Sequence, residues 1–548
     1  MMKKGLSILL VCVLVTLLCC GCGKGGKDKQ LVVPLDADPE YLDPAIASSQ
    51  SERNIIANVF EGLMTYDETG ALVPAAAERY EVSDDGLTYT FHLKENLRWR
   101  VTKLASGVLG EDAATFDKTL TAADFVFGLR RTLDPATGSP WAPMLLAVKN
   151  ADAVQKGELK PKKLGLKAAD DRTLVIRLDH PDDGFPAALT LPGAMPCSKV
   201  YFEATGGRYG LAAEYLIYNG PFYISNWNPG TAVTVRRNGT VSDVAYYDET
   251  DVYPSSVYFS INNEQDTRDE KLENGTYHLA PLTATQAFDL QTKGSTQIRA
   301  FGAATFCLLF NCADEVLRDY DIRCAIAGTF DPAPLQQLKG TLAAAGVVPP
   351  ACICGSDPYR ENVKPIALPQ LTKRQAKQQM QQGMDKRNFK DVDLTVLCTE
   401  ANETAVRTAM QQWQSVFGVH FSVTVEVLDD AALSARVQSG DYQLAFASLA
   451  FEQSTAQQAL ERFRTGSADN VVGLASARYD ALLDIVARAK KQSDKLITVR
   501  AAETFLIDHA VVLPISEASK ELGLGKGVSG VAFTPTGDVW RFQHAICA

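Results

Sequence analysis

The stretch that decides the fold class lies late in the chain, at residues 393–428, and reads DLTVLCTEANETAVRTAMQQWQSVFGVHFSVTVEVL. Its ends, Leu394–Leu397 and Phe421–Val427, are rich in β-branched and apolar residues, which predicts two strands. The segment between them, Glu403–Phe417, has helical apolar spacing. Four large apolar side chains lie near one face of that helix: Val406, Met410, Trp413 and Phe417. A strand, helix and strand joined by short links form a βαβ unit, so the strands should be parallel neighbours.

The same alternation of strand and helix patterns continues outward along the chain, which predicts an α/β protein. Tyr442–Ser448 predicts a further strand beside the βαβ unit. Partial alternation of apolar and polar residues predicts four half-buried strands elsewhere, at Thr88–Lys94, Arg172–Leu178, Ala232–Arg236 and Val257–Ile261. Thr121 and Asp124 have the spacing of a capping box, so a helix should begin there and end before Pro135.

Composition narrows the class of function. The chain has 548 residues, which corresponds to about three domains at roughly 100–200 residues per domain. Lys and Arg number 54 and Asp and Glu 65, a net charge of −11. This acidic balance argues against nucleic acid as a partner, because phosphate binding needs a surplus of cations. The six histidines form no HExxH pair, and the chain has no GxSxG or Walker motif, so an enzyme is not favoured.

The N-terminus has the features of an export signal. Two lysines precede an apolar run, Leu6–Leu18, that is short for a membrane span. The following Cys-Cys-Gly-Cys sequence resembles a bacterial lipoprotein signal. We expect lipidation at Cys22, because Gly21 precedes it, with Cys20 as the alternative. The signal peptide would then be residues 1–22 and the flexible linker 23–30. A simple signal peptide or an uncleaved anchor is also possible at this stage.

Eight cysteines remain beyond the signal region: Cys197, Cys307, Cys312, Cys324, Cys352, Cys354, Cys398 and Cys547. Export permits disulfides, but spacing alone does not give their pairing. Cys352 and Cys354 are too close in sequence for the usual zinc knuckle, which has two to four residues between its cysteines. A structural role is therefore favoured over a metal site, and we expect no cofactor.

Short motifs recur in a fixed order over some 300 residues: Tyr41–Pro44, Asn58–Leu63, Gly86–Leu93, Leu97–Trp99, Thr121–Val126, Asn219–Tyr223 and Asp321–Arg323. With these motifs the chain resembles the extracellular solute-binding proteins of peptide-type ABC importers, the oligopeptide- and dipeptide-binding family, from about Leu31 to the C-terminus. Each motif alone is weakly specific, and their combination carries the resemblance. Most of them should be scaffold: Phe60 and Trp99 are expected in the core.

The resemblance implies a two-lobed, periplasmic-binding-protein-like hinged fold with an extra domain beside the first lobe. Three segments would form the discontinuous first lobe: 31–60, 198–303 and 511–548. Residues 61–197 would form the extra domain, and 304–510 the second lobe. Arg100–Leu120 is longer than the family's link at this position and predicts a surface loop.

The resemblance also implies where a peptide would bind. Glu452 takes the place of the family's acidic residue that meets the peptide ammonium, although it could instead be a solvated loop residue. Ser448, Leu449 and Ala450 fall on the strand edge that would pair with peptide backbone. Ser48, Ser49 and Gln50 would offer backbone groups from the opposite side of the cleft, or could be an ordinary loop.

These expectations together describe a lipid-anchored receptor on the outer face of the bacterial cell membrane. It would bind peptides between its lobes and deliver them to the permease subunits of an ABC importer. We expect a monomer that binds no nucleic acid. The alternative keeps the fold and changes the ligand to a non-peptide solute, either a metal chelate or an oligosaccharide.

Overall fold

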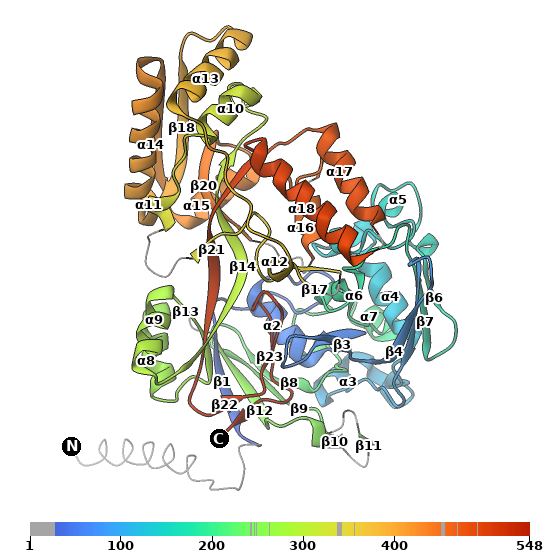
Figure 1. The fold of residues 1–548 in the computed structure, drawn as a ribbon. Helices are drawn as coiled ribbons and strands as arrows, with labels where there is room; N and C mark the ends of the chain where they lie inside the picture. Colours follow the sequence, from blue (N-terminus) through green and yellow to red (C-terminus); the bar gives the residue numbers. More distant parts are fainter. Residues whose placement is uncertain are drawn as a thin grey trace, which may run out of the picture.

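The computed structural model describes residues 28–241, 244–245, 247, 249–261, 264–336, 342–355, 357–450, 455–467, 469–489 and 491–548 (Figure 1). Cys22 and Glu452 therefore lie outside the described residues. No helix in the described part is both long and apolar enough to cross a lipid bilayer.

The largest sheet contains both strands of residues 393–428, the stretch that predicted the fold class. Its path is β13-β21-β14-β20-β18-β19, and β15 (Leu342–Ala343) also pairs with β21. The bounds of the strands on that path are Leu279–Leu282, Val512–Leu524, Gln297–Phe310, Leu444–Ala450, Val392–Thr399 and Phe421–Leu428. β18 and β19 are parallel, with Leu394 opposite Val423. Between them α14 spans Glu403–Phe417. The predicted βαβ unit and the strand after it are thus confirmed.

Two four-stranded sheets lie at the other end of the molecule (Figure 1). The first has the order β1-β12-β9-β8, with bounds Gln30–Leu35, Ser256–Ile261, Ala232–Arg237 and Phe222–Asn228. The second has the order β4-β5-β7-β6, with bounds Ala77–Val82, Thr88–Leu93, Thr173–Arg177 and Leu166–Ala168. The four strands predicted from alternation correspond to β5, β7, β9 and β12.

The other strands form short two-stranded ladders. These are β2–β3 (Met64–Tyr66, Leu72–Pro74), β10–β11 (Thr240–Val241, Val244–Ala245), β16–β17 (Ile353–Cys354, Asp357–Pro358), β22–β25 (Val528–Ser529, Ile546–Cys547) and β23–β24 (Ala532–Phe533, Trp540–Arg541).

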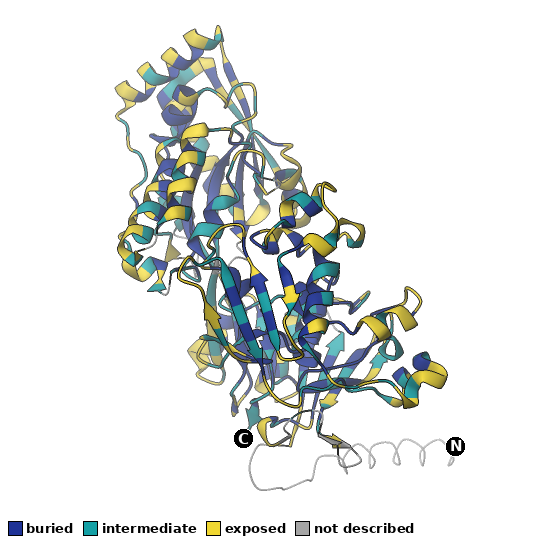
Figure 2. Ribbon diagram, turned by 90° about the vertical axis from the view of Figure 1, so that its right-hand side faces the viewer, coloured by how far each residue is buried: buried dark blue, intermediate teal, exposed yellow. Residues whose placement is uncertain are grey.

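Seventeen α-helices in the described part cover these sheets: α2 (Gln50–Val59), α3 (Lys103–Leu109), α4 (Ala122–Thr132), α5 (Ala151–Gln155), α6 (Phe185–Ala188), α7 (Lys199–Ala204), α8 (Arg268–Glu273), α9 (Ala284–Lys293), α10 (Tyr320–Ala327), α11 (Ala333–Gln336), α12 (Tyr359–Asn362), α13 (Lys373–Arg387), α14, α15 (Asp430–Ser439), α16 (Ala456–Glu461), α17 (Ala477–Arg488) and α18 (Gln492–Asp508). Their outer faces are largely exposed, while the strands beneath are largely buried (Figure 2). The predicted capping box of Thr121 and Asp124 opens α4.

The buried apolar residues form two large cores. The first core draws on residues between Leu31 and Phe259, together with Leu279 and residues 522–545. The second core draws on residues 307–515. Phe60 and Trp99, expected in the core, are each 1% exposed and belong to the first. The sequence that would form the extra domain shares this first core, since Phe91 and Phe125 lie in it with Val33.

Two long strands connect the cores. β14 and β21 run side by side between the upper and lower parts of the molecule (Figure 1). β21 contributes Ile515 to the second core and Leu522 to the first. The β14–β21 ladder shifts its register between Gly302 and Ala304, close to the level at which the strands pass from one core to the other.

The Arg100–Leu120 segment is not a loop, so this prediction was wrong. Lys103–Leu109 forms α3, whose N-cap is the side chain of Thr102, and a 3-10 helix, Gly110–Ala114, follows. Ala105 is fully buried and Leu109 is 6% exposed, both in the first core. Burial of this apolar face outweighs the low helix propensity of Gly107.

None of the eight cysteines beyond the signal region forms a disulfide. Four of them, Cys307, Cys312, Cys324 and Cys398, lie within the second core or against it, and two more, Cys352 and Cys354, are buried there beside α18. Cys197 lies in the first core and Cys547 packs against it. Burial raises the pKa of the Cys354 thiol to about 11, so this group is a thiol rather than a thiolate at neutral pH. The cysteines act as small apolar side chains.

Candidate functional site

The end of β20 has an open edge, and this is where the sequence placed the peptide-pairing residues. All residues of β20 pair with β14 on one side. On the other side, the ladder between β20 and β18 joins Leu444 and Ala445 alone within the described strands. Ser448 and Ala450 are exposed and Leu449 is buried, as the alternation of a strand requires. An unpaired edge of this kind can accept an added strand.

One carbonyl on this edge already has a partner. The guanidinium of Arg462, the residue that follows α16, donates through Nη1 to the carbonyl oxygen of Ala450 at 2.9 Å. Burial lowers the pKa of Arg462 from its ordinary value. A ligand backbone that reached Ala450 would therefore compete with a charged donor, so the backbone groups of Ser448, two residues earlier on the same side of the strand, are less hindered.

Ser48, Ser49 and Gln50 lie at the start of α2, and part of their hydrogen-bonding capacity is already in use. The N–H groups of Ser48 and Ser49 both donate to Oε2 of Glu52 at 2.9 Å. The hydroxyl of Ser49 accepts from the N–H of Glu52, which completes a capping box. Oε1 of Gln50 accepts from Nζ of Lys520 on β21 at 3.5 Å. These contacts fix the N-terminus of α2 beside one of the connecting strands.

An apolar pocket opens where the two cores meet. It encloses about 1060 Å³ of empty space, its open mouth included. The main apolar side chains that line it are Ile56, Met64, Met144, Leu191, Met195 and Phe533. All of its apolar walls come from the first-core side of the molecule, while Gln458 of α16 lines it from the second. A concave, largely apolar site with a few polar groups is typical of ligand pockets.

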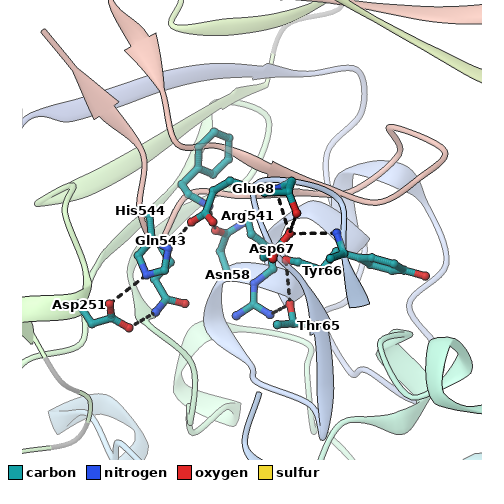
Figure 3. Close-up of polar contacts among 12 residues, drawn as sticks. Asn58, Thr65, Tyr66, Asp67, Glu68, Asp251, Arg541, Gln543 and His544 are labelled. Atoms are coloured by element: carbon teal, nitrogen blue, oxygen red, sulfur yellow. Dashed lines mark hydrogen bonds and ion pairs between the residues drawn. The ribbon is translucent and has the colours of Figure 1, made fainter. Parts of the chain in front are cut away.

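A polar cluster adjoins this pocket and shares Arg541 and Thr65 with it (Figure 3). His544 lies between two carboxylates: Nδ1 faces Glu68, and Nε2 faces Oδ1 of Asp251 at 3.0 Å. Both ring nitrogens of His544 are therefore occupied by contacts with carboxylate oxygens. Nε2 of Gln543 donates to Asp251 at 2.8 Å.

The Glu61 carboxylate of this cluster is also engaged. The hydroxyl of Tyr247 donates to Glu61, and burial together with the Glu61 carboxylate raises the pKa of Tyr247 well above its ordinary value. The cluster is thus a network of satisfied ion pairs and hydrogen bonds that holds the C-terminal segment against β2 and β3.

Tyr66 and Phe533 line the apolar pocket, whereas the tryptophans Trp227, Trp413 and Trp540 do not. Trp413 and Trp540 are each buried in a core at no more than 1% exposure. Trp227 lines a separate surface pocket with Leu104 and Leu211. No group of three or more His, Cys, Asp or Glu suited to a metal ion occurs within the described ranges.

Sequence reasoning missed the apolar pocket and Arg541. Most pocket residues come from α2, β2, the segment 187–195 and the turn 532–541, and Met144 and Gln458 complete the lining. These segments are far apart in the chain and share no spacing. The one available signal was the C-terminal Trp540–Phe542, where a cation lies between two aromatic residues, and it names no partner. Folding alone brings these segments together.

The chain matches the family model "Bacterial extracellular solute-binding proteins, family 5 Middle" over residues 71–470. It is 27% identical to the probable deoxycholate-binding periplasmic protein YgiS of Escherichia coli over 491 residues, 87% of this chain and 86% of that protein. It is 25% identical to the dipeptide-binding protein of Lactococcus lactis over 571 residues, 99% of this chain and 98% of that protein.

Solved structures give the same fold. OppA of Haemophilus influenzae, in complex with the peptide RPPGFSPFR, superposes with a TM-score of 0.74 at 20% identity, covering 96% of this chain and 100% of that one. At this identity the likeness establishes the two-lobed fold. From the match of the family model to most of its length, this chain belongs to the bacterial extracellular solute-binding proteins of family 5.

Proposed function

We propose that this protein is an extracytoplasmic receptor that binds peptides between its two cores and delivers them to an ABC importer. The observation that carries the proposal is the open edge of β20 beyond Ala445, in the part of the strand that contains Ser448–Ala450. Backbone pairing on such an edge gives affinity for peptides without reading every side chain. The name of the Lactococcus lactis relative, a dipeptide-binding protein, supports the same substrate class.

Binding would close the molecule about β14 and β21. The proposed lobes are the predicted ones, with the extra domain at 61–197 beside the first lobe. Core membership supports one change: Val511–Ile515 pack in the second core, so the chain would return to the first lobe after Ile515 rather than at Val511. A hinge of two connecting strands is a common device for domain closure around a ligand.

Membrane attachment belongs to the same proposal. A diacylglyceryl group on Cys22 would tether the receptor near its permease, with residues 23–30 as the flexible linker. Mass spectrometry of the membrane-extracted protein should show the lipid on the mature N-terminus. An unmodified N-terminus would remove the lipid anchor from the proposal and leave the peptide receptor. We also propose that the receptor acts as a monomer.

The test of the ligand class is direct. Purified protein without its signal segment is denatured, and the released small molecules are identified by mass spectrometry. A set of peptides with varied side chains supports the proposal. A single non-peptide compound, such as the bile acid that names the Escherichia coli relative, contradicts the peptide assignment and keeps the family. If nothing is released, binding of a tetrapeptide library to refolded protein replaces this measurement.

A further inference from the structure

The apolar pocket has the shape and chemistry to take one bulky apolar group. Three of its six main apolar side chains are methionines: Met64, Met144 and Met195. Methionine is unbranched and polarizable, so it adapts to differently shaped apolar groups. Filling the pocket would remove apolar surface from water on both partners, which favours binding.

Arg541 lies at the border of this pocket. Its guanidinium donates to the hydroxyl oxygen of Thr65 (Figure 3). In the described part of the chain it forms no ion pair with a carboxylate. The neighbouring carboxylates are engaged elsewhere. In the polar cluster, Glu68 and Asp251 face His544, Glu61 accepts from Tyr247, and Asp67 accepts from Thr69 and Ala71. Asp538, which lines the same pocket as Arg541, forms an ion pair with Lys520.

A guanidinium beside an apolar wall is suited to a carboxylate, because the two planar groups form short, charge-assisted hydrogen bonds. The desolvated surroundings strengthen that contact relative to the same contact in water. The site therefore combines an apolar cavity with a cation at its edge, and a matching ligand carries an apolar group next to an anion.

We propose that the apolar pocket takes a large apolar group while Arg541 binds the carboxylate beside it. In a peptide, this is a C-terminal residue with a large apolar side chain, so the receptor prefers peptides that end in Leu, Met or Phe. The peptide source rests on the proposed function. A bile acid offers the same chemistry, an apolar body with a carboxylate, and the experiment separates the two sources.

The first measurement is isothermal titration of the refolded, ligand-free protein with tetrapeptides that differ only at the C-terminus. Ala-Ala-Ala-Leu as the free acid is compared with its C-terminal amide and with Ala-Ala-Ala-Gly. We expect the amide and the glycine peptide to bind roughly tenfold more weakly, the scale of losing a charge-assisted hydrogen bond or a buried side chain. Equal affinity for all three overturns the inference and leaves the peptide receptor intact.

Variants then assign the two parts of the site. Arg541→Gln should lower the affinity for the free-acid peptide roughly tenfold and leave the affinity for the amide nearly unchanged. Arg541→Lys should restore part of the preference for the free acid. Arg318→Gln, at an exposed position away from the pocket, is the matched control. If Arg541→Gln weakens acid and amide equally, Arg541 only supports the fold, and the inference fails.

Ala57→Phe adds bulk to the pocket from α2. This variant should bind Ala-Ala-Ala-Leu more weakly and bind Ala-Ala-Ala-Gly with unchanged affinity. An equal loss of affinity for both peptides would contradict the apolar subsite. Deoxycholate is titrated in parallel. Deoxycholate binding that requires Arg541, with no peptide binding, supports the pocket chemistry and overturns the peptide function. If neither a peptide nor deoxycholate binds, both are overturned.

Discussion

At the scale of single residues, the family's motifs are mainly scaffold. The Asp43 carboxylate accepts from both terminal nitrogens of Arg131, and the two side chains are 6% and 12% exposed. Asn219 exchanges two hydrogen bonds with the backbone of Glu61. At Gly220 a Cβ atom would approach the backbone of Val59 to 2.6 Å, so only glycine fits. The contacts of Asp43 and Asn219 join the segments proposed for the first lobe to the segment proposed for the extra domain.

The buried pair of Asp43 and Arg131 gives a stability prediction. Asp43→Asn should lower the free energy of unfolding by about 3–5 kcal/mol, because it leaves Arg131 buried without its counter-charge. Urea denaturation followed by circular dichroism measures this change. Asp152→Asn, which breaks the exposed pair with Lys156, should cost less than about 1 kcal/mol. Equal costs for the two variants would show that burial adds nothing to the first pair.

Glu452 gives a prediction from sequence alone, since it lies outside the described residues. If its carboxylate meets the peptide ammonium, Glu452→Ala should weaken peptide binding roughly tenfold or more, as expected for losing a charge-assisted contact. The melting temperature of the free protein should move by only a few degrees. An unchanged dissociation constant in isothermal titration would remove Glu452 from the site.

At the scale of elements, α14 and α3 show when sequence patterns suffice. α14 carries four large apolar residues at helical spacing and has the predicted bounds. α3 is about half as long and contains Gly107, so its local signal is weak. It forms because Ala105 and Leu109 pack into the first core, beside α7 and the turn 213–215. Tertiary packing decides short helices more than propensity does.

This packing of α3 can be tested within one helix. Leu109→Ala should destabilise the protein by about 2–3 kcal/mol, because it removes a side chain that is 6% exposed. Leu104→Ala is the control, since Leu104 is 61% exposed and should change stability by less than about 0.5 kcal/mol. Thermal or urea unfolding compares the two. Similar small effects would mean that α3 rests loosely on the surface.

At the scale of the whole molecule, contacts between the two cores hold the present arrangement. Nζ of Lys495 in α18 forms an ion pair with Asp183, next to α6. Beside it, Gln458 of α16 lies so close to Gly184 that a Cβ atom there would meet the side-chain amide at 2.5 Å. Among the described strands, β14 and β21 run from one core to the other, so such contacts bias how closed the molecule is.

Breaking the Lys495–Asp183 pair should therefore favour a more open molecule. Asp183→Asn should weaken peptide binding by up to about fivefold, because a partly exposed ion pair contributes at most about 1 kcal/mol. Small-angle scattering of the ligand-free variant should give a larger radius of gyration. Glu403→Gln, which breaks a pair within α14, should change neither value. If Asp183→Asn behaves like this control, the ion pair plays no part in closure.

The sequence by itself determined the α/β class, the βαβ unit, the helix cap at Thr121 and the family, because these depend on local spacing and on the order of short motifs. It also directed attention to Ser448–Ala450, whose open edge follows from the path of neighbouring strands. Only the tertiary structure decided that Arg100–Leu120 contains a helix and that Arg541 borders an apolar pocket. Both depend on contacts between residues far apart in the chain, and no local pattern encodes which distant segments will share a core.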